Sequence, residues 1–477
     1  MNDGKHEHGD GEFDKAILDH QIQVMQAAHK DVAVTAGDGA SPRAPGEPFG
    51  FLFRENRLLV RPDIATEVMR FLEGGKTKAQ VLPTSALQSN HRSAGRMDAA
   101  QSDLDRSDEM ASTLPIQLHI PDCEPVRGVP AISRLVQENF GPDDEGFPAA
   151  SPHHAFYMTP KGPMCPATEP DEVGRTEPVY PSMRPAGSGA GSAVAVLDTG
   201  FIRSAAGHFR WLRGVSEWDP DRVDKFDIDH LTDSPDGFID PYAGHGTFIA
   251  GVIGRIAPDA DIHVRRLDID LRKVFTQWPS YAADIVDELH LPDHIRMALW
   301  AGRRVISVSA GGPTLNDQPP LSFRGIRPLL ERDEAVIIAA AGNESSAQPF
   351  WPAAFDWVTG VGALDATRTG LASFSNFGGN ADVYAPGTDI VNAYACGQYE
   401  CFQPPNIGKV RHFHGLAKWS GTSFATPVVA GLVAARMAAQ GETAPTAVAA
   451  LLKVADTSHV LAGVGPTLMP EYTDLGI

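Results

Sequence analysis

The chain has 477 residues, a formal net charge of −20 at pH 7, 42% hydrophobic residues and 21% charged residues. This length is enough for a large hydrophobic core and two folded units, and the composition is that of a globular protein. The negative charge argues against nucleic acid and anionic membrane surfaces as partners. No apolar run reaches the roughly 18–20 residues of a membrane span, and the polar N-terminus lacks the pattern of a secretory signal. We therefore expect a cytoplasmic protein.

The four cysteines are too few for a disulfide scaffold, and none has the paired spacing of a zinc site. Cys123 and Cys165 are expected to be free thiols. Cys396 and Cys401 enclose only four residues, which leaves two alternatives: a disulfide in an oxidising compartment or two free thiols.

The first 191 residues divide by composition into three segments. Residues 1–46 are polar and predict a tail with at most one helix. Residues 47–160 predict a small α+β domain without any group at catalytic spacing. Residues 161–191 are rich in Pro, Gly and Ser and predict a linker. The α+β domain is expected to contain a strand or hairpin over 49–60, a helix over 64–72, a strand over 116–120, a helix over 131–140 and a strand near 155–158.

From residue 192 short apolar runs alternate with helical patterns, which predicts an α/β domain with a doubly wound, mostly parallel sheet over 192–465. Residues 466–477 are left as a C-terminal tail. Ligands of such sheets bind beyond the carboxyl ends of the strands, so those ends are where a site is expected. The predicted strands are 193–197, 262–266, 305–309, 335–340, 357–361 and 382–385, and the predicted helices lie near 246–255, 281–301, 322–332, 423–439 and 443–454.

Four polar residues follow core elements of this domain: Asp198, His245, Asn343 and Ser423. Each alone has a structural interpretation, as a turn aspartate, a buried histidine, a turn asparagine or a helix N-cap. Together they form the set that nucleophilic acyl transfer requires. Ser423 would be the nucleophile, His245 the general base and then acid, and Asp198 the residue that orients the imidazole. The amide of Asn343 and the backbone N–H of Ser423 would stabilise the oxyanion.

With these residues the chain resembles the subtilisin-like serine proteases, the subtilase family, in which the order is also Asp, His, Ser. The resemblance covers about residues 192–456. It implies that Ser309, Ala310, Gly311 and Gly312 line the substrate groove and add a strand to the bound peptide, and that the Trp351–Pro352 bond is cis. The matching segments are Asp198-Thr199-Gly200, Gly244-His245-Gly246-Thr247, Ser309-Ala310-Gly311-Gly312, Ala341-Gly342-Asn343, Ala385-Pro386-Gly387 and Gly421-Thr422-Ser423-Phe424-Ala425-Thr426-Pro427.

Glu344 follows the expected oxyanion asparagine. In relatives this position borders the pocket for the residue before the scissile bond. A carboxylate there gives the hypothesis that Lys or Arg is favoured at that substrate position.

The sequence predicts no metal site and no required cofactor. The calcium-binding loop that many relatives insert after the histidine helix has no room here. The acidic stretch 219–240 is either a calcium site or a solvated loop, and the solvated loop is favoured because the stretch lacks the EF-hand pattern. Residues 396–418 look like an insertion that forms one wall of the cleft, with His412 and His414 as loop residues.

The leading hypothesis is a serine endopeptidase acting on protein or peptide substrates. The alternative is a catalytically silent module that binds peptides under the control of the N-terminal domain. That domain is either a removable propeptide that blocks the cleft or a permanent regulatory domain, so autoinhibition is an open expectation.

Overall fold

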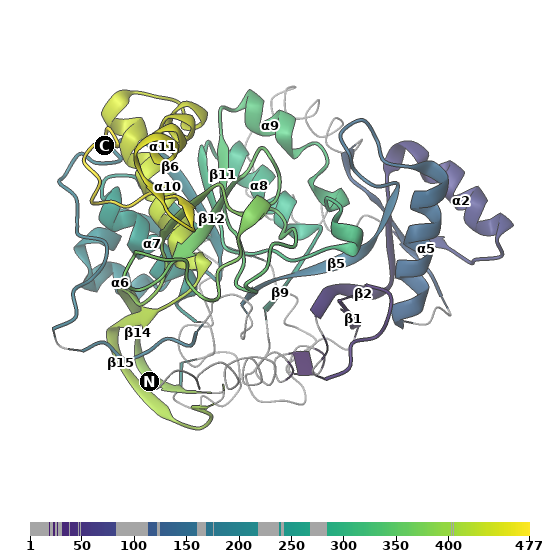
Figure 1. Cartoon of the computed structure of the whole chain (residues 1–477), viewed down its shortest axis with the longest axis horizontal. Helices are drawn as coiled ribbons and strands as arrows, with labels where there is room; N and C mark the ends of the chain where they lie inside the picture. Colours follow the sequence, from purple (N-terminus) through teal and green to yellow (C-terminus); the bar gives the residue numbers. More distant parts are fainter. Residues whose placement is uncertain are drawn as a thin grey trace, which may run out of the picture.

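A computed structural model gives the structure of residues 31–477, together with residues 19, 22, 23 and 26. Within residues 31–477, the described part leaves out 38, 46, 48, 83–112, 122–124, 160–167, 175, 218–237, 240–242, 268–283, 402 and 404. Two large sheets organise these residues. One lies mainly in the first half of the chain, here the residues before 192, and the other lies in the second half, from residue 192 on. Figure 1 shows the helices that pack against them.

The sheet of the second half is entirely parallel among the described strands, in the order β13-β12-β11-β10-β6-β8-β7. The predicted parallel sheet is therefore confirmed. Its strands begin and end within three residues of the predictions, and the sequence analysis missed only the short outer strand β7. The strands are β6 (Ala193–Asp198), β7 (Val215–Glu217), β8 (Asp261–Arg266), β10 (Val305–Val308), β11 (Val336–Ala340), β12 (Thr359–Leu364) and β13 (Val383–Pro386).

Helices cover both faces of this sheet because its strands are apolar on both sides. In β6, Val194 and Val196 pack into one core, and Ala195 and Leu197 pack into the other. The first core holds α7 (His245–Ile256), α10 (Thr422–Gln440) and α11 (Ala444–Ser458), and the second holds α8 (His290–Trp300) and α9 (Ile326–Arg332). The short helix α6 (Arg203–His208) follows β6.

One helix prediction is wrong at its start. A helix was expected over 281–301, but α8 begins only at His290, and β9 (Asp284–Asp287) precedes it.

Among the described helices, α10 alone is long and apolar enough to cross a membrane by length and composition, and most of it is buried inside the protein. It is the core helix that its apolar sequence predicts.

The sheet of the first half has the order β3-β4-β2-β5-β9, with β1 paired to β2. Two predictions are corrected here. Residues 49–60 form one strand that bends near Asn56 (φ 57°), not a hairpin, and β1 lies inside the predicted polar tail. The elements of the first half are β1 (Val32–Ala36), β2 (Phe49–Val60), α2 (Ala65–Gly74), β3 (Gln80–Val81), β4 (Ile116–His119), α5 (Pro125–Phe140) and β5 (Ala150–Thr159).

The strand β5 joins the two halves. Its first residues pair with β2 of the N-terminal sheet, and its last residues pair with β9 of the second half. In Figure 1 it runs from the unit that carries α2 and α5 toward the central sheet. The small α+β domain is therefore continuous, through one strand, with an element of the α/β domain.

The predicted loop over 396–418 is instead part of an antiparallel hairpin of β14 (Ile390–Glu400) and β15 (Val410–Trp419). The linker docks on this hairpin, where Asp171 and Lys418 exchange backbone hydrogen bonds of 2.8 and 2.9 Å. Cys396 lies in this hairpin as an exposed free thiol, so it does not pair with Cys401, which follows β14 directly. Cys123 and Cys165 lie outside the described residues.

The C-terminal residues, predicted as a tail from residue 466, pack on the α/β domain. They include β17 (Gly465–Pro466), which pairs with β16 (Val460–Leu461), and Leu468 and Leu475, which are buried.

The last turn of α7 packs against a backbone carbonyl. A Cβ atom added at Gly254 would lie 2.2 Å from the carbonyl oxygen of Trp211. We predict that Gly254→Ala lowers the free energy of unfolding by about 1–3 kcal/mol, although alanine normally favours a helix interior by about 1 kcal/mol. Gly74→Ala at the end of α2 is the control, because nothing lies within 4 Å of its added Cβ. Urea unfolding measures both, and equal stability of the two variants would contradict the close packing.

Candidate active site

The carboxylate and imidazole predicted from the sequence lie in direct contact. Asp198 is the last residue of β6, and His245 is the first residue of α7. The Nδ1 atom of His245 lies 2.7 Å from Asp198 Oδ1, and both residues are fully buried. The same oxygen accepts the backbone N–H of Thr199 at 2.8 Å. The carboxylate thus fixes the ring orientation and leaves Nε2 pointing away from it.

The glycines beside His245 allow this approach. Gly244 has φ 82°, a left-handed conformation that favours glycine. A Cβ at Gly246 would lie 2.4 Å from the carbonyl oxygen of Gly200. Larger residues at these two positions would push α7 away from the end of β6.

Ser423 is the second residue of α10, and this helix begins beside the start of α7. The ring of the next residue, Phe424, lies 5.2 Å from the His245 imidazole, and Trp419 packs on it at 5.4 Å. Among the described residues, His245 Nε2 is buried without a hydrogen-bond partner. A buried nitrogen of this kind is suited to take and return a proton.

Asn343 lies just beyond β11 and contacts the start of α10. Its Oδ1 atom accepts the backbone N–H of Thr422 at 2.9 Å. Its Nδ2 atom is buried and has no partner in the described part of the chain. Because the carbonyl end of the amide is held by the residue before Ser423, the N–H₂ end remains as a donor for an oxyanion.

The predicted groove residues, Ser309 to Gly312, directly follow β10. Ser309 Oγ donates to the backbone carbonyl of Ser423 at 3.4 Å. Gly311 exchanges backbone hydrogen bonds with Tyr157 of β5, at 3.0 and 3.1 Å. Since β9 pairs with the other side of β5, β5 is the middle strand of a three-stranded arrangement at this groove. Sequence analysis did not predict that β5 pairs with these residues.

Glu344 lies beside this strand and is already hydrogen-bonded. Its Oε2 atom accepts from Asn376 Nδ2 at 2.6 Å, and its Oε1 atom accepts from the Tyr157 phenol at 3.0 Å. Burial raises the pKa of Glu344 to about 7, although both hydrogen bonds favour the ionised form.

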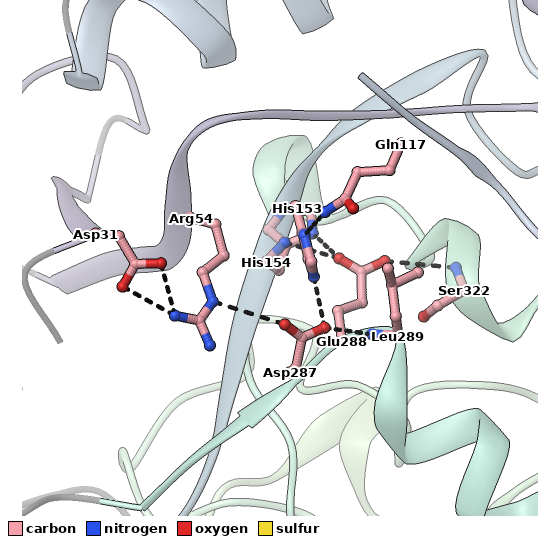
Figure 2. A network of polar contacts seen from close by, with 9 residues as sticks. All are labelled: Asp31, Arg54, Gln117, His153, His154, Asp287, Glu288, Leu289 and Ser322. Atoms are coloured by element: carbon pink, nitrogen blue, oxygen red, sulfur yellow. Dashed lines mark hydrogen bonds and ion pairs between the residues drawn. The ribbon is translucent and has the colours of Figure 1, made fainter. Parts of the chain in front are cut away.

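A polar network fastens β5 to the second half of the chain (Figure 2). His153 Nε2 lies 2.6 Å from Asp287 Oδ1, and His154 Nδ1 lies 2.8 Å from Glu288 Oε2. His154 Nε2 accepts the backbone N–H of Leu315 at 3.1 Å, so His154 donates from Nδ1. Because His154 and Glu288 are buried, separating them would leave polar groups without partners inside the protein.

The acidic stretch 219–240 lies almost wholly outside the described residues, so its calcium alternative stays a prediction. Among the residues that the structure describes, no group of three or more His, Cys, Asp or Glu side chains is placed to hold a metal ion. The Trp351–Pro352 bond is cis, as the resemblance implied.

The similarity to known proteins lies in the second half of the chain, which contains the α/β domain. The family model described as "Subtilase family" matches residues 189–465, more than half of the sequence. A thermophilic serine proteinase of Bacillus sp. (strain AK1) is 32% identical over 265 residues, which are 53% of each chain. Thermitase of Thermoactinomyces vulgaris is 30% identical over 56% of this chain and 82% of its own. This chain thus spans about half of the first relative's length and about four-fifths of thermitase's.

A solved structure, a cold adapted subtilisin-like serine proteinase, covers 63% of this chain and 96% of its own, with a TM-score of 0.42 and 21% identity. The family model does not extend to the residues before 189, which include β5.

The raised pKa of Glu344 has a consequence for stability. An unfolded glutamate ionises near its model value of 4.5, whereas the folded protein keeps this carboxyl protonated up to about pH 7. The folded state therefore loses stability as pH rises from about 4.5 to 7. We predict that Glu344→Gln changes stability little at pH 4 and raises it by up to about 3 kcal/mol at pH 8, from 1.36 kcal/mol per pKa unit.

Glutamine can still accept from Asn376 and donate to the Tyr157 oxygen, so the packing is matched. Thermal unfolding at both pH values measures the difference. The same stability difference at pH 4 and pH 8 would contradict the raised pKa.

Proposed function

Because the chain belongs to the subtilase family of serine proteases, we propose that it hydrolyses peptide bonds through Asp198, His245 and Ser423. The observation that carries the proposal is the 2.7 Å contact of His245 with Asp198, at the start of the helix beside the one that carries Ser423. The alternative of a silent binding module is not favoured, because the chain carries each group that acyl transfer needs: Asp198, His245, Asn343 and Ser423.

The reaction begins when Ser423 Oγ attacks the peptide carbonyl carbon while His245 Nε2 takes the hydroxyl proton. The carbonyl oxygen becomes negative and accepts hydrogen bonds from Asn343 Nδ2 and the Ser423 backbone N–H at the start of α10. The C–N bond then breaks as His245 gives its proton to the leaving amine. Water, deprotonated by His245, hydrolyses the acyl ester and restores Ser423. Asp198 stays ionised and stabilises the imidazolium throughout.

We also propose that the N-terminal domain inhibits the site in the full chain. The strand β5 already holds the backbone groups of Gly311 that a substrate peptide would use. Asp198, His245, Asn343 and Ser423 are all 0% exposed. The buried pairs of β5 with Asp287 and Glu288 oppose its release.

Thr168, which directly follows residues 160–167, also lies next to the site. Thr168 accepts hydrogen bonds from the Trp419 side chain and from the Ser420 backbone, through its carbonyl and hydroxyl oxygens respectively. The described ends of this interval therefore lie at β5 and beside the nucleophile helix. Intact mass tests whether the protein cleaves itself in this interval. Self-cleavage is supported if the mass of the wild type corresponds to a chain cut within this interval while Ser423→Ala keeps its full length.

The inhibition proposal predicts that loosening β5 raises activity. Phe156 is buried beside Gly312, whose added Cβ would lie 3.2 Å from the Phe156 ring. A carboxylate there has no partner and disfavours the docked strand. We expect Phe156→Asp to increase peptide hydrolysis and fluorophosphonate labelling of Ser423 at least tenfold over the full-length wild type. Leu135→Asp, at an exposed position of α5, is the control, and equal activity of the two variants would refute inhibition by β5.

The catalytic roles predict distinct losses when measured in the Phe156→Asp chain. Ser423→Ala should abolish labelling and lower kcat by at least about 10⁴-fold. Asn343→Leu should lower kcat by about 10²–10³ with little change in KM, since removal of such a donor in subtilisin, a member of this family, has that effect. A change confined to KM would show that Asn343 only binds substrate.

A further inference from the structure

We infer that Glu344 determines specificity by accepting a hydrogen bond from a tyrosine of the substrate, at the position where the Tyr157 side chain now lies. The inference rests on the proposed function, because it treats β5 as a stand-in for the substrate. It replaces the hypothesis that Glu344 selects lysine or arginine by charge.

The backbone of Tyr157 is positioned as a substrate residue would be. It exchanges both hydrogen bonds with Gly311 and pairs on its other side with Ile285 of β9. This double pairing fixes which residue of an extended peptide can place its side chain here, because register in a sheet determines where each side chain points.

The Tyr157 side chain has an aromatic neighbour along its ring and a hydrogen-bond acceptor at its tip. The residue is fully buried, and its ring packs edge-on against Phe350, with centroids 5.8 Å apart. Its hydroxyl donates to Glu344 Oε1 at 3.0 Å. The ring also passes Gly312, where an added Cβ would lie 3.5 Å from a Tyr157 ring carbon. A flat ring with a donor at its tip fits this combination.

The acceptor is held in place by the catalytic half of the chain. Asn376 donates from Nδ2 to Glu344 Oε2 and accepts the Glu344 backbone N–H through Oδ1, at 2.6 and 2.9 Å. Asn376 is itself fixed by its backbone N–H and its Nδ2, which donate to the carbonyls of Gly342 and Ala341. Glu344, Asn376 and Phe350 therefore remain after β5 has left. The N-terminal sheet supplies the Phe49 ring, which packs edge-on against Tyr157, and also Val34 and Leu52 of the same apolar cluster.

A tyrosine side chain fits this position better than phenylalanine or lysine does. Phenylalanine would fill the space but would leave the buried Glu344 oxygen without a donor. Lysine offers a donor, but it lacks a ring to pack on Phe350. A phenol needs no opposite charge to donate its hydrogen bond.

The test uses the full chain with Phe156→Asp, so that peptides can enter. Matched peptides carry Tyr, Phe or Lys at each of the four positions before the scissile bond, and kcat/KM is measured for each. The expected result is a preference for Tyr over Phe of about tenfold at one of these positions. Glu344→Leu in the same chain should remove the preference, and Glu344→Gln, which can still hydrogen-bond the phenol, should keep part of it.

Three other outcomes are informative. Cleavage without a Tyr preference at any position, or a Tyr preference that persists in Glu344→Leu, would overturn the inference and leave the proposed function standing. A preference for Lys that Glu344→Leu removes would overturn it in favour of charge selection. Failure of the Phe156→Asp chain to react with a fluorophosphonate, when circular dichroism shows it folded and hydrogen exchange shows the Tyr157 amide unprotected, would overturn the proposed function itself.

Discussion

The docking of the first turn of α10 against the ends of β10 and β11 is the interaction on which the site depends. Thr422 donates its backbone N–H to Asn343 and accepts the Gly342 backbone N–H through its hydroxyl, while Ser309 donates to the Ser423 carbonyl. These contacts hold Ser423 and Asn343, the proposed nucleophile and oxyanion donor, in one geometry. They also explain why Asn343 presents its N–H₂ group, since a reversed amide would lose the Thr422 hydrogen bond.

A second constraint is the continuity of β5 between the two halves of the chain. The strand cannot leave the groove without losing its pairing with Gly311 and β9 and the buried contacts of His154 with Glu288. A strand that only bridged two domains would not need to lie beside Glu344. Under the proposed inhibition, β5 competes with substrate for the backbone of Gly311, and its side chains indicate what the groove accepts.

The sequence predicts the parallel sheet and the polar residues at its strand ends, because apolar runs and turn motifs are local signals. It does not predict that Tyr157 lies beside Gly311, since backbone pairing between distant segments leaves no mark in composition. The strand β9 was hidden in a stretch that looked helical because it has only four residues. The hairpin left a partial signal in the sequence. In β15 the polar residues His412, His414 and Lys418 alternate with Phe413, Ala417 and Trp419, which are buried, as expected of a strand with one buried face.

The most direct test of the central claim follows the Tyr157 amide by hydrogen exchange while a peptide boronate bonds to Ser423 Oγ in the full chain. The boronate peptide must take the place of β5, so the Tyr157 N–H should lose its protection while the Gly311 N–H, now bonded to the peptide, keeps it. If Tyr157 stays protected after Ser423 has been fully modified, β5 does not occupy the substrate groove.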